Sequence, residues 1–240
     1  MSSLDVALAA IRNARPRRVV VFTGAGVSAD SGIPTFRGRG GLWRDFRSED
    51  LATPEAFARD PALVWEWYEW RRGLIRDATP NAAHEAIARL PDAVVVTQNV
   101  DNLHQRAGAP DVVELHGNIF RVRCTEEGTV QLRLDAFPDV PPRCACGALL
   151  RPDVVWFGEM LPDDAVVRAT SLIRKSDLLL VIGTSGMVYP AAGFVRLHRG
   201  LSIEINPDPE NAGTSCQLLV QMTAADATPP IVDAILEVRV

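Results

Sequence analysis

The residues best suited to chemistry begin at a glycine-rich turn, Gly24-Ala25-Gly26-Val27-Ser28-Ala29. A short β-branched run at 18–23 precedes it, so a buried parallel strand is predicted to end in this turn. In a dinucleotide-binding turn the first glycine permits the bend, the second lets the backbone approach a pyrophosphate, and a small residue at Ala29 lets helix and strand pack closely. Ser28 is expected to cap the following helix, whose N–H groups would hold the anion. A plain tight turn is the alternative for the glycines alone.

The chain after this turn differs from that of an ordinary dehydrogenase, which would continue through a helix to a second strand with an acidic end about 20 positions on. Here the segment Ser31-Gly32-Ile33-Pro34-Thr35-Phe36-Arg37-Gly38 follows. Pro34 and its neighbouring glycines exclude a long helix, and 38–44 is predicted to be a loop. We therefore expect a nucleotide bound in a variant way, beneath a flexible segment that carries Phe36 and Arg37.

A second polar group, Gln98-Asn99-Val100-Asp101-Asn102-Leu103-His104, follows a strand predicted at 93–97. Ligands of open α/β sheets bind at the carboxyl ends of the strands. The amides of Gln98 and Asn99 suit a carboxamide or ribose hydroxyls, and Asp101 could anchor a polar ring substituent. Asn102 and His104 are expected to cap or pack a helix.

One histidine also follows a predicted strand. The strand at 112–115 ends in His116-Gly117, where the glycine would keep the imidazole edge open. Such a histidine is a candidate general base, and a structural histidine is the alternative. His84 and His198 lie in predicted helices and are expected to be structural.

A phenol and a guanidinium are predicted to share a helix face within Trp65-Glu66-Trp67-Tyr68-Glu69-Trp70-Arg71. Tyr68 and Arg71 are three residues apart, so their side chains are neighbours on a helix. Together they could bind a carboxylate, since arginine can contact both of its oxygens. The alternative is a surface arginine beside a core tyrosine, with the tryptophans simply packing.

The four cysteines are too few for a disulfide scaffold, and three of them, Cys124, Cys144 and Cys146, form a cluster in the sequence that suggests a metal site. Three thiolates do not complete a tetrahedral structural zinc site. Glu127, or less favourably Glu126, could supply the fourth ligand. A module that lacks metal and is held by packing is the alternative, and Cys216 is expected to be inert.

The elements that position these residues alternate between helix and strand, which predicts an α/β domain with a parallel sheet. Further strands are predicted at 178–183 and 202–206, and helices at 2–14, 81–90, 163–176 and 191–199. Two insertions break the alternation: a helical module at 37–80 and a cysteine module at 117–155. We expect a single catalytic domain, 1–240, with a large Rossmann-like lobe (1–36, 81–116 and 156–240). The two insertions would form a small lobe, in which the cysteine module at 117–155 resembles a zinc ribbon.

Composition limits the function classes. Hydrophobic residues make up 47% and charged residues 23%, which is typical of a soluble globular protein. The net charge of −5 argues against a nucleic-acid-binding surface and gives no attraction to anionic membranes. No apolar run approaches the roughly 20 residues of a membrane span, and the N-terminus does not resemble a signal peptide. We expect a cytoplasmic, monomeric protein.

Taken together, these blocks resemble in order and spacing the signature blocks of the sirtuins, which are NAD-dependent protein deacylases. The likeness spans about 18–235 and covers the glycine segment up to Arg37, 97–104 and Leu115-His116-Gly117, followed by Phe157-Gly158-Glu159-Met160-Leu161-Pro162 and Gly183-Thr184-Ser185. Several long blocks in register are far more specific than a single glycine motif.

The resemblance implies the chemistry. NAD would lie at the glycine turn, and Gln98, Asn99 and Asp101 would contact nicotinamide. The acyl-lysine oxygen would attack the ribose carbon, expelling nicotinamide and giving an alkylimidate. Phe36 would then cover the sugar, and His116, with Asn99 the catalytic pair, would act as the general base on the ribose hydroxyls. Water would complete the transfer, giving lysine and O-acyl-ADP-ribose.

The resemblance also implies the remaining ligand contacts. Gly183-Thr184-Ser185 and Asn206-Pro207-Asp208 match phosphate and adenosine contacts, and Ala224 matches an adenine contact in a stretch that departs from the usual glycine pattern. The other implied NAD contacts are Pro34, Thr35, Phe36, Arg37, Trp43 and Val100.

Within this resemblance, Tyr68 and Arg71 match the Tyr-x-x-Arg of sirtuins that remove succinyl, malonyl or similar acidic groups. We therefore favour an acyl-lysine protein substrate of that class, with acetyl also accepted. Sirtuins usually bind a structural zinc through two pairs of cysteines, and Glu127 stands here where a second thiolate would be.

Two further functions stay open. A mono-ADP-ribosyltransferase would share every NAD residue and would not require Tyr68 and Arg71. A binding module that senses NAD or ADP-ribose without turnover is the alternative of another class, although His116 and Asn99 argue against it.

Overall fold

The structure, a computed structural model, describes residues 1–35, 48–186, 191–208 and 215–239. Its main sheet has six parallel strands in the order β3-β2-β1-β7-β8-β9. The strands are β1 (Val19–Thr23), β2 (Val94–Thr97), β3 (Val112–Glu114), β7 (Leu178–Ile182), β8 (Leu201–Ile205) and β9 (Leu218–Val220). This is the strand order of a Rossmann fold, and it confirms the predicted parallel α/β architecture.

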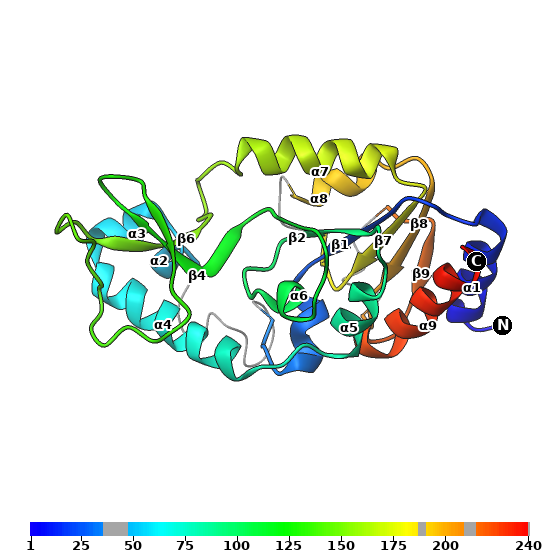
Figure 1. Ribbon diagram of the computed structural model, residues 1–240, viewed down its shortest axis with the longest axis horizontal. Helices are drawn as coiled ribbons and strands as arrows, with labels where there is room; N and C mark the ends of the chain where they lie inside the picture. The colour runs from blue at the N-terminus through cyan, green and yellow to red at the C-terminus, as the bar shows by residue number, and fades with distance from the viewer. Residues whose placement is uncertain (36–47, 187–190, 209–214, 240) are drawn as a thin grey trace.

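Helices cover both faces of this sheet, as parallel crossover connections require (Figure 1). One face is covered by α1 (Ser3–Ala14), α5 (Ala82–Ala88) and α9 (Ala224–Glu237). The other is covered by α7 (Asp163–Lys175), α8 (Ala191–Phe194) and the 3-10 helix η2 (Val195–Leu197). The short helix α6 (Leu103–Arg106) follows β2.

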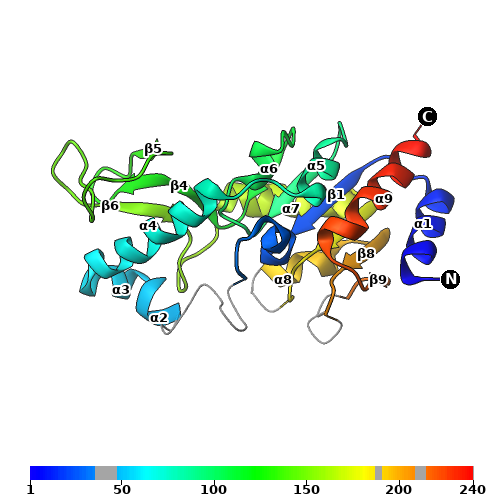
Figure 2. The same cartoon turned by 90° about the horizontal axis from the view of Figure 1, so that it is seen from below.

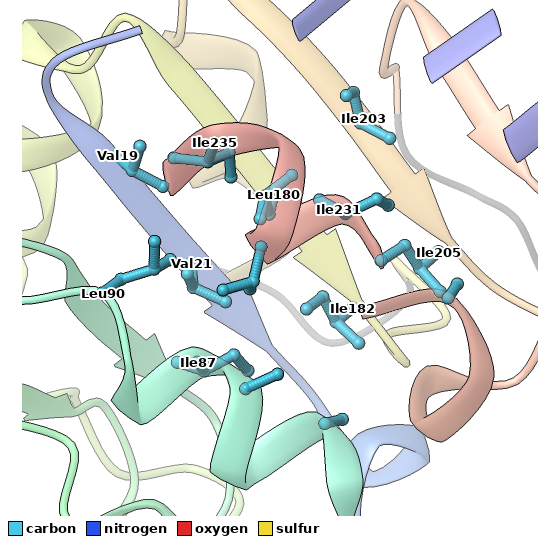
Figure 3. Packing of buried hydrophobic residues seen from close by; sticks show 14 of the residues in the cluster. Val19, Val21, Ile87, Leu90, Leu180, Ile182, Ile203, Ile205, Ile231 and Ile235 are labelled. Carbon is cyan, nitrogen blue, oxygen red and sulfur yellow. The ribbon is translucent and has the colours of Figure 1, made fainter. Parts of the chain in front are cut away.

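The core of the first face is almost entirely aliphatic (Figure 3). Val21 of β1 and Leu180 of β7 are fully buried, and Ile231 and Ile235 of α9 pack against the same face. The strands β1 and β7 are buried along their whole length. Their ends are therefore rigidly placed.

The small lobe combines a second sheet with three helices (Figure 2). Its antiparallel strands, in the order β5-β4-β6, are β4 (Gly117–Cys124), β5 (Val130–Leu132) and β6 (Leu150–Val154). The helices are α2 (Ser48–Leu51), α3 (Pro54–Arg59) and α4 (Pro61–Asp77). The Asp60 side chain caps α4, and Pro61 occupies its first turn, where a missing N–H costs nothing. The limits of the two lobes stay a prediction.

Three details differ from the sequence expectations. The glycine turn leads into a 3-10 helix, η1 (Ala25–Ser31), whose N-cap is Gly24, so the predicted capping role of Ser28 is wrong. The helix predicted at 191–199 is divided into α8 and η2. Strand β9 and helix α9 were not predicted, and α9 contains Pro229 and Pro230, which are unfavourable inside a helix. Among the described residues, no helix is long and apolar enough to cross a membrane.

Candidate active site

The glycine turn is locked against the end of the neighbouring strand β7. The N–H of Gly24 donates to the oxygen of Ile182, and that of Gly26 donates to the oxygen of Gly183 at 2.8 Å. A Cβ on Gly26 would lie 2.7 Å from the Cα of Gly183, which itself has a φ of +63°. Both positions therefore require glycine, and the backbone stays accessible where a phosphate would approach.

The polar residues after β2 meet the turn in one buried network. The Ser28 hydroxyl donates to Asp101 at 2.7 Å and accepts from the Asn99 side-chain amide at 3.2 Å. The N–H of Leu103 donates to the second Asp101 oxygen. Burial raises the pKa of Asp101, although these donors and the charge of Arg71 act against it. Ser28 thus orients Asn99 and Asp101 instead of capping a helix.

A hydrogen bond fixes the tautomer of His116. Its Nδ1 lies 2.9 Å from the backbone oxygen of Gln98, and because a carbonyl oxygen only accepts, Nδ1 must carry the hydrogen. Burial lowers the pKa of His116, so the ring is neutral near pH 7. A neutral ring with hydrogen on Nδ1 has a bare Nε2, which is the form that a general base needs.

The remaining strand ends are connected across the same sheet edge. The Gln98 side-chain amide donates to the Thr184 hydroxyl at 3.1 Å, and that of Asn206 donates to the Thr184 backbone oxygen at 3.3 Å. The N–H of Ala225, next to Ala224 in the first turn of α9, donates to Asp30 of η1. The structure therefore brings together predicted residues of the glycine turn, of the run after β2, and of the ends of β7 and β8. Pro34, Thr35, Val100 and Ser185 are partly buried, whereas Ala29, Pro207 and Asp208 are exposed.

Tyr68 and Arg71 are both buried on α4, at 2% and 4% exposure. The Arg71 guanidinium lies 4.7 Å from the centre of the Trp67 ring and 5.5 Å from that of Tyr68. Burial lowers the pKa of Arg71, while the charge of Asp101 acts against this shift. The interpretation of Arg71 as a surface residue is therefore wrong, and its charge acts at the network that contains Asp101.

The cysteine cluster also assembles in space. The ligand atoms of Cys124, Glu127, Cys144 and Cys146 all lie within 4.8 Å of one another. The N–H of Glu127 donates to the Cys124 sulfur and lowers the pKa of that thiol. Three sulfurs and one carboxylate oxygen make a donor set that could hold a zinc ion in a tetrahedral structural site.

Comparison with known proteins decides the family. A model described as the Sir2 family matches residues 24–190. The chain is 52% identical over 230 residues to NAD-dependent protein deacylase 2 of Pyrobaculum aerophilum, covering 92% of each chain. The chain belongs to the Sir2 family.

Solved structures of Sir2 homologues agree with this. One, in complex with NAD, is 44% identical, has a TM-score of 0.87, and covers 97% of this chain and 94% of that chain. Another, a triple mutant in complex with 2′-O-acetyl ADP-ribose, is 43% identical with a TM-score of 0.87, over 97% and 96%. Of the predicted contacts in this Sir2-family chain, Phe36, Arg37 and Trp43 lie outside the described residues.

Sequence reasoning missed several residues of this Sir2-family site. Trp156 donates its indole N–H to the Tyr68 hydroxyl, although its only signal was an aromatic residue directly before the 157–162 block. Thr23 and Thr97 share a hydrogen bond behind the polar network, and His104 contacts Thr23. Thr97 and His104 belong to the 97–104 block, but no spacing rule links them to Thr23 or links Trp156 to Tyr68. His84 and His198 are buried, as expected for structural histidines.

Proposed function

We propose that this protein is an NAD-dependent protein-lysine deacylase that removes succinyl and malonyl groups as well as acetyl, giving nicotinamide and O-acyl-ADP-ribose. Membership of the Sir2 family supports the deacylase reaction. The observation that supports the acyl preference is that Tyr68 and Arg71 are buried side by side on α4. The positive charge of Arg71 interacts with Asp101 of the polar network.

The carboxyl edge of the main sheet fits NAD. The close-packed glycines leave backbone exposed for the pyrophosphate, and the amides of Gln98 and Asn99 suit a carboxamide. Thr184 and Asn206, at the ends of β7 and β8, would hold the adenosine side. When bound, NAD supplies the ribose carbon that accepts the acyl oxygen, with nicotinamide as the leaving group.

His116 would act after nicotinamide leaves. Its bare Nε2 would take a proton from a ribose hydroxyl, while its Nδ1–H stays on the Gln98 oxygen and stabilises the charge that develops on the ring. Asn99, whose side-chain amide is held by the Ser28 hydroxyl, would help to position the ribose hydroxyls. Because burial lowers the pKa of His116, we expect the acid limb of kcat/KM to lie below the ordinary value of 6.5.

The acyl pocket would bind a carboxylate through the Tyr68 hydroxyl and the Arg71 guanidinium. Burial strengthens such an interaction, because water competes poorly for the ions. Guanidinium also stays charged when buried, which a lysine would not do reliably. An acetyl group would enter the same pocket without using either polar group.

One incubation tests the proposal. The protein and NAD are mixed separately with acetyl-, malonyl- and succinyl-lysine peptides, and the products are weighed by mass spectrometry. The expected products are free lysine, nicotinamide and acyl-ADP-ribose, with succinyl or malonyl favoured in kcat/KM. Modified protein in place of acyl-ADP-ribose would indicate a mono-ADP-ribosyltransferase, and no nicotinamide from any peptide would indicate a sensor.

The cysteine cluster would hold a structural zinc through Cys124, Cys144, Cys146 and Glu127, tying β4 to the 144–146 turn. Metal analysis of protein purified without chelator tests this. We expect one zinc per chain, lost more readily in Glu127→Gln and retained more firmly in Glu127→Cys. A metal-free protein of equal stability would show that packing alone holds the module.

The monomeric state, the cytoplasmic location, and the absence of nucleic-acid and membrane partners stay predictions.

A further inference from the structure

Trp156 determines what the Tyr68 hydroxyl can do. It follows β6 and is 3% exposed, and its Nε1–H donates to the Tyr68 oxygen at 2.9 Å. An indole N–H can only donate, so the phenol oxygen is the acceptor in this bond. The hydrogen of the Tyr68 hydroxyl is therefore left for another acceptor, and none occurs among the residues that the structure describes.

The indole itself is held from several sides. The Arg151 guanidinium lies 3.5 Å from the centre of the ring, and the Phe57 ring lies 5.3 Å away. Glu159 accepts from Arg151 at 2.6 and 2.9 Å and from the Trp156 backbone N–H at 2.8 Å. The indole cannot turn away from Tyr68 without breaking these contacts, so its N–H points in a fixed direction.

A fixed indole restricts the direction of the phenol hydrogen. The hydrogen of a phenol prefers the plane of its ring, where it has two orientations. The indole N–H occupies the lone pair on one side of the oxygen, which leaves the other orientation for a donor bond. Tyr68 is thereby preset as a donor beside the Arg71 guanidinium, and a carboxylate accepts from both without the phenol having to reorient.

We propose that Trp156 is a positioning residue for acyl specificity, which aims the Tyr68 hydroxyl at the carboxylate of a dicarboxylic acyl group. This inference rests on the proposed function of Tyr68 and Arg71. An acetyl group has no carboxylate, so its turnover does not depend on the direction of that hydroxyl. Trp156 then affects the choice between acyl groups and not the chemistry at the ribose.

Trp156→Phe tests this role, because it removes the N–H and keeps an aromatic ring against Phe57 and Arg151. The measured quantity is the ratio of kcat/KM for succinyl- over acetyl-lysine peptide. We expect the ratio to fall about threefold to tenfold, the value of one net hydrogen bond. The fall should appear mainly in KM, since the carboxylate is bound before and during the reaction.

Trp65→Phe is the matched control. Trp65, on α4, is also buried, and its indole N–H donates to the Leu150 oxygen at 2.7 Å and not to the Tyr68 hydroxyl. Its loss should lower stability without moving the ratio. A second measurement uses the Tyr68→Phe background, where Trp156→Phe should add no further loss of selectivity. The reason is that either change alone already removes the hydrogen-bonded pair of indole and phenol.

Two results would overturn the inference. One is an unchanged ratio in Trp156→Phe, and the other is a ratio that falls additively with Tyr68→Phe. If Arg71→Met lowers the ratio and Trp156→Phe does not, only the positioning role is lost. If Arg71→Met leaves the ratio unchanged, the acidic acyl preference itself is lost.

Discussion

At the carboxyl edge of the main sheet the glycine turn of the predicted NAD site is shaped by backbone, whereas the predicted acyl pocket is shaped by long side chains. In the first region, Gly24 and Gly26 contact the Gly183 backbone. In the second, Tyr68, Arg71 and Trp156 interact through rings and a hydrogen bond. Under the proposed function, the fold would position the step common to all acyl groups, while a few exchangeable side chains would determine which acyl group is preferred.

The largest expected effect is on the common step. His116→Ala should lower deacylation of every acyl peptide by about 10²–10⁴-fold, the usual contribution of a general base. Steady-state kinetics with acetyl and succinyl peptides measure it. His198→Gln is the control, since His198 bonds to Ser176 near the amino ends of β7 and β8, away from the carboxyl edge, and should change stability more than turnover. Full turnover in His116→Ala would remove the general-base role.

Arg71→Met should separate the two regions. We expect the succinyl-over-acetyl ratio of kcat/KM to fall about tenfold to a hundredfold, as for the loss of a charge-assisted hydrogen bond. Arg76→Met, on the same helix but partly exposed and paired with Glu69, is the matched control and should leave the ratio unchanged. Equal loss of both activities in Arg71→Met would show that the guanidinium supports the fold and not the choice of acyl group.

Two glycines, one in each region, sharpen the contrast in rigidity. Gly26→Ala should cost about 1–3 kcal/mol of unfolding free energy through overpacking and should weaken NAD binding, because its Cβ would meet the Gly183 backbone at 2.7 Å. Gly73→Ala, inside α4, meets only the end of Arg76 at 3.9 Å and should stabilise by about 0.5–1 kcal/mol. Urea unfolding and NAD titration measure both. A neutral Gly26→Ala would contradict the tight packing of the turn.

Acid should weaken the large lobe before the small one, since all four histidines lie outside 37–80 and 117–155. Burial lowers the pKa of His84 to about 4 and that of His104 to about 3, from 6.5. Between pH 6.5 and these lowered pKa values, the histidines bind protons more readily in the unfolded chain than in the folded protein. The free energy of unfolding is therefore highest above pH 6.5 and falls as the pH drops.

The expected slope is about 1.4 kcal/mol per pH unit for each such histidine. Urea unfolding between pH 7 and 4 measures the slope, which should be smaller in His84→Gln. Hydrogen exchange over the same range would show whether the sheet edge opens first. A slope equal to that of the variant would mean that His84 is accessible to protons in the folded state.

Sequence patterns predicted the sheet edge well because its residues are consecutive. The runs from Gly24 to Ala29 and from Gln98 to Asp101 follow a strand directly, and His116 comes two residues after β3. The carboxyl ends of parallel strands meet at one edge of a sheet. The patterns failed for β9 and α9. Leu218–Val220 is too short for periodicity, and Pro229 and Pro230 conceal a helix that tertiary packing stabilises.

The residues of the proposed acyl pocket were only partly predictable. Tyr68 and Arg71 were found because a helix places residues three apart on one face, but the burial of Arg71 was not foreseen. Trp156 was missed because it lies 88 residues from Tyr68 in sequence, and no local spacing reveals such a contact. The role expected for Ser28 failed for the same reason, since its partners Asn99 and Asp101 are distant along the chain.

Gly24, Gly26 and Gly183 contribute only backbone to the floor of the proposed nucleotide site. Any change in the preference for altered dinucleotides, whether by natural substitution or by design, would therefore have to involve side chains at the rim of the site. Analogues modified where they touch this floor should be rejected across the family members that share the three glycines. Analogues modified at the rim should distinguish one member from another.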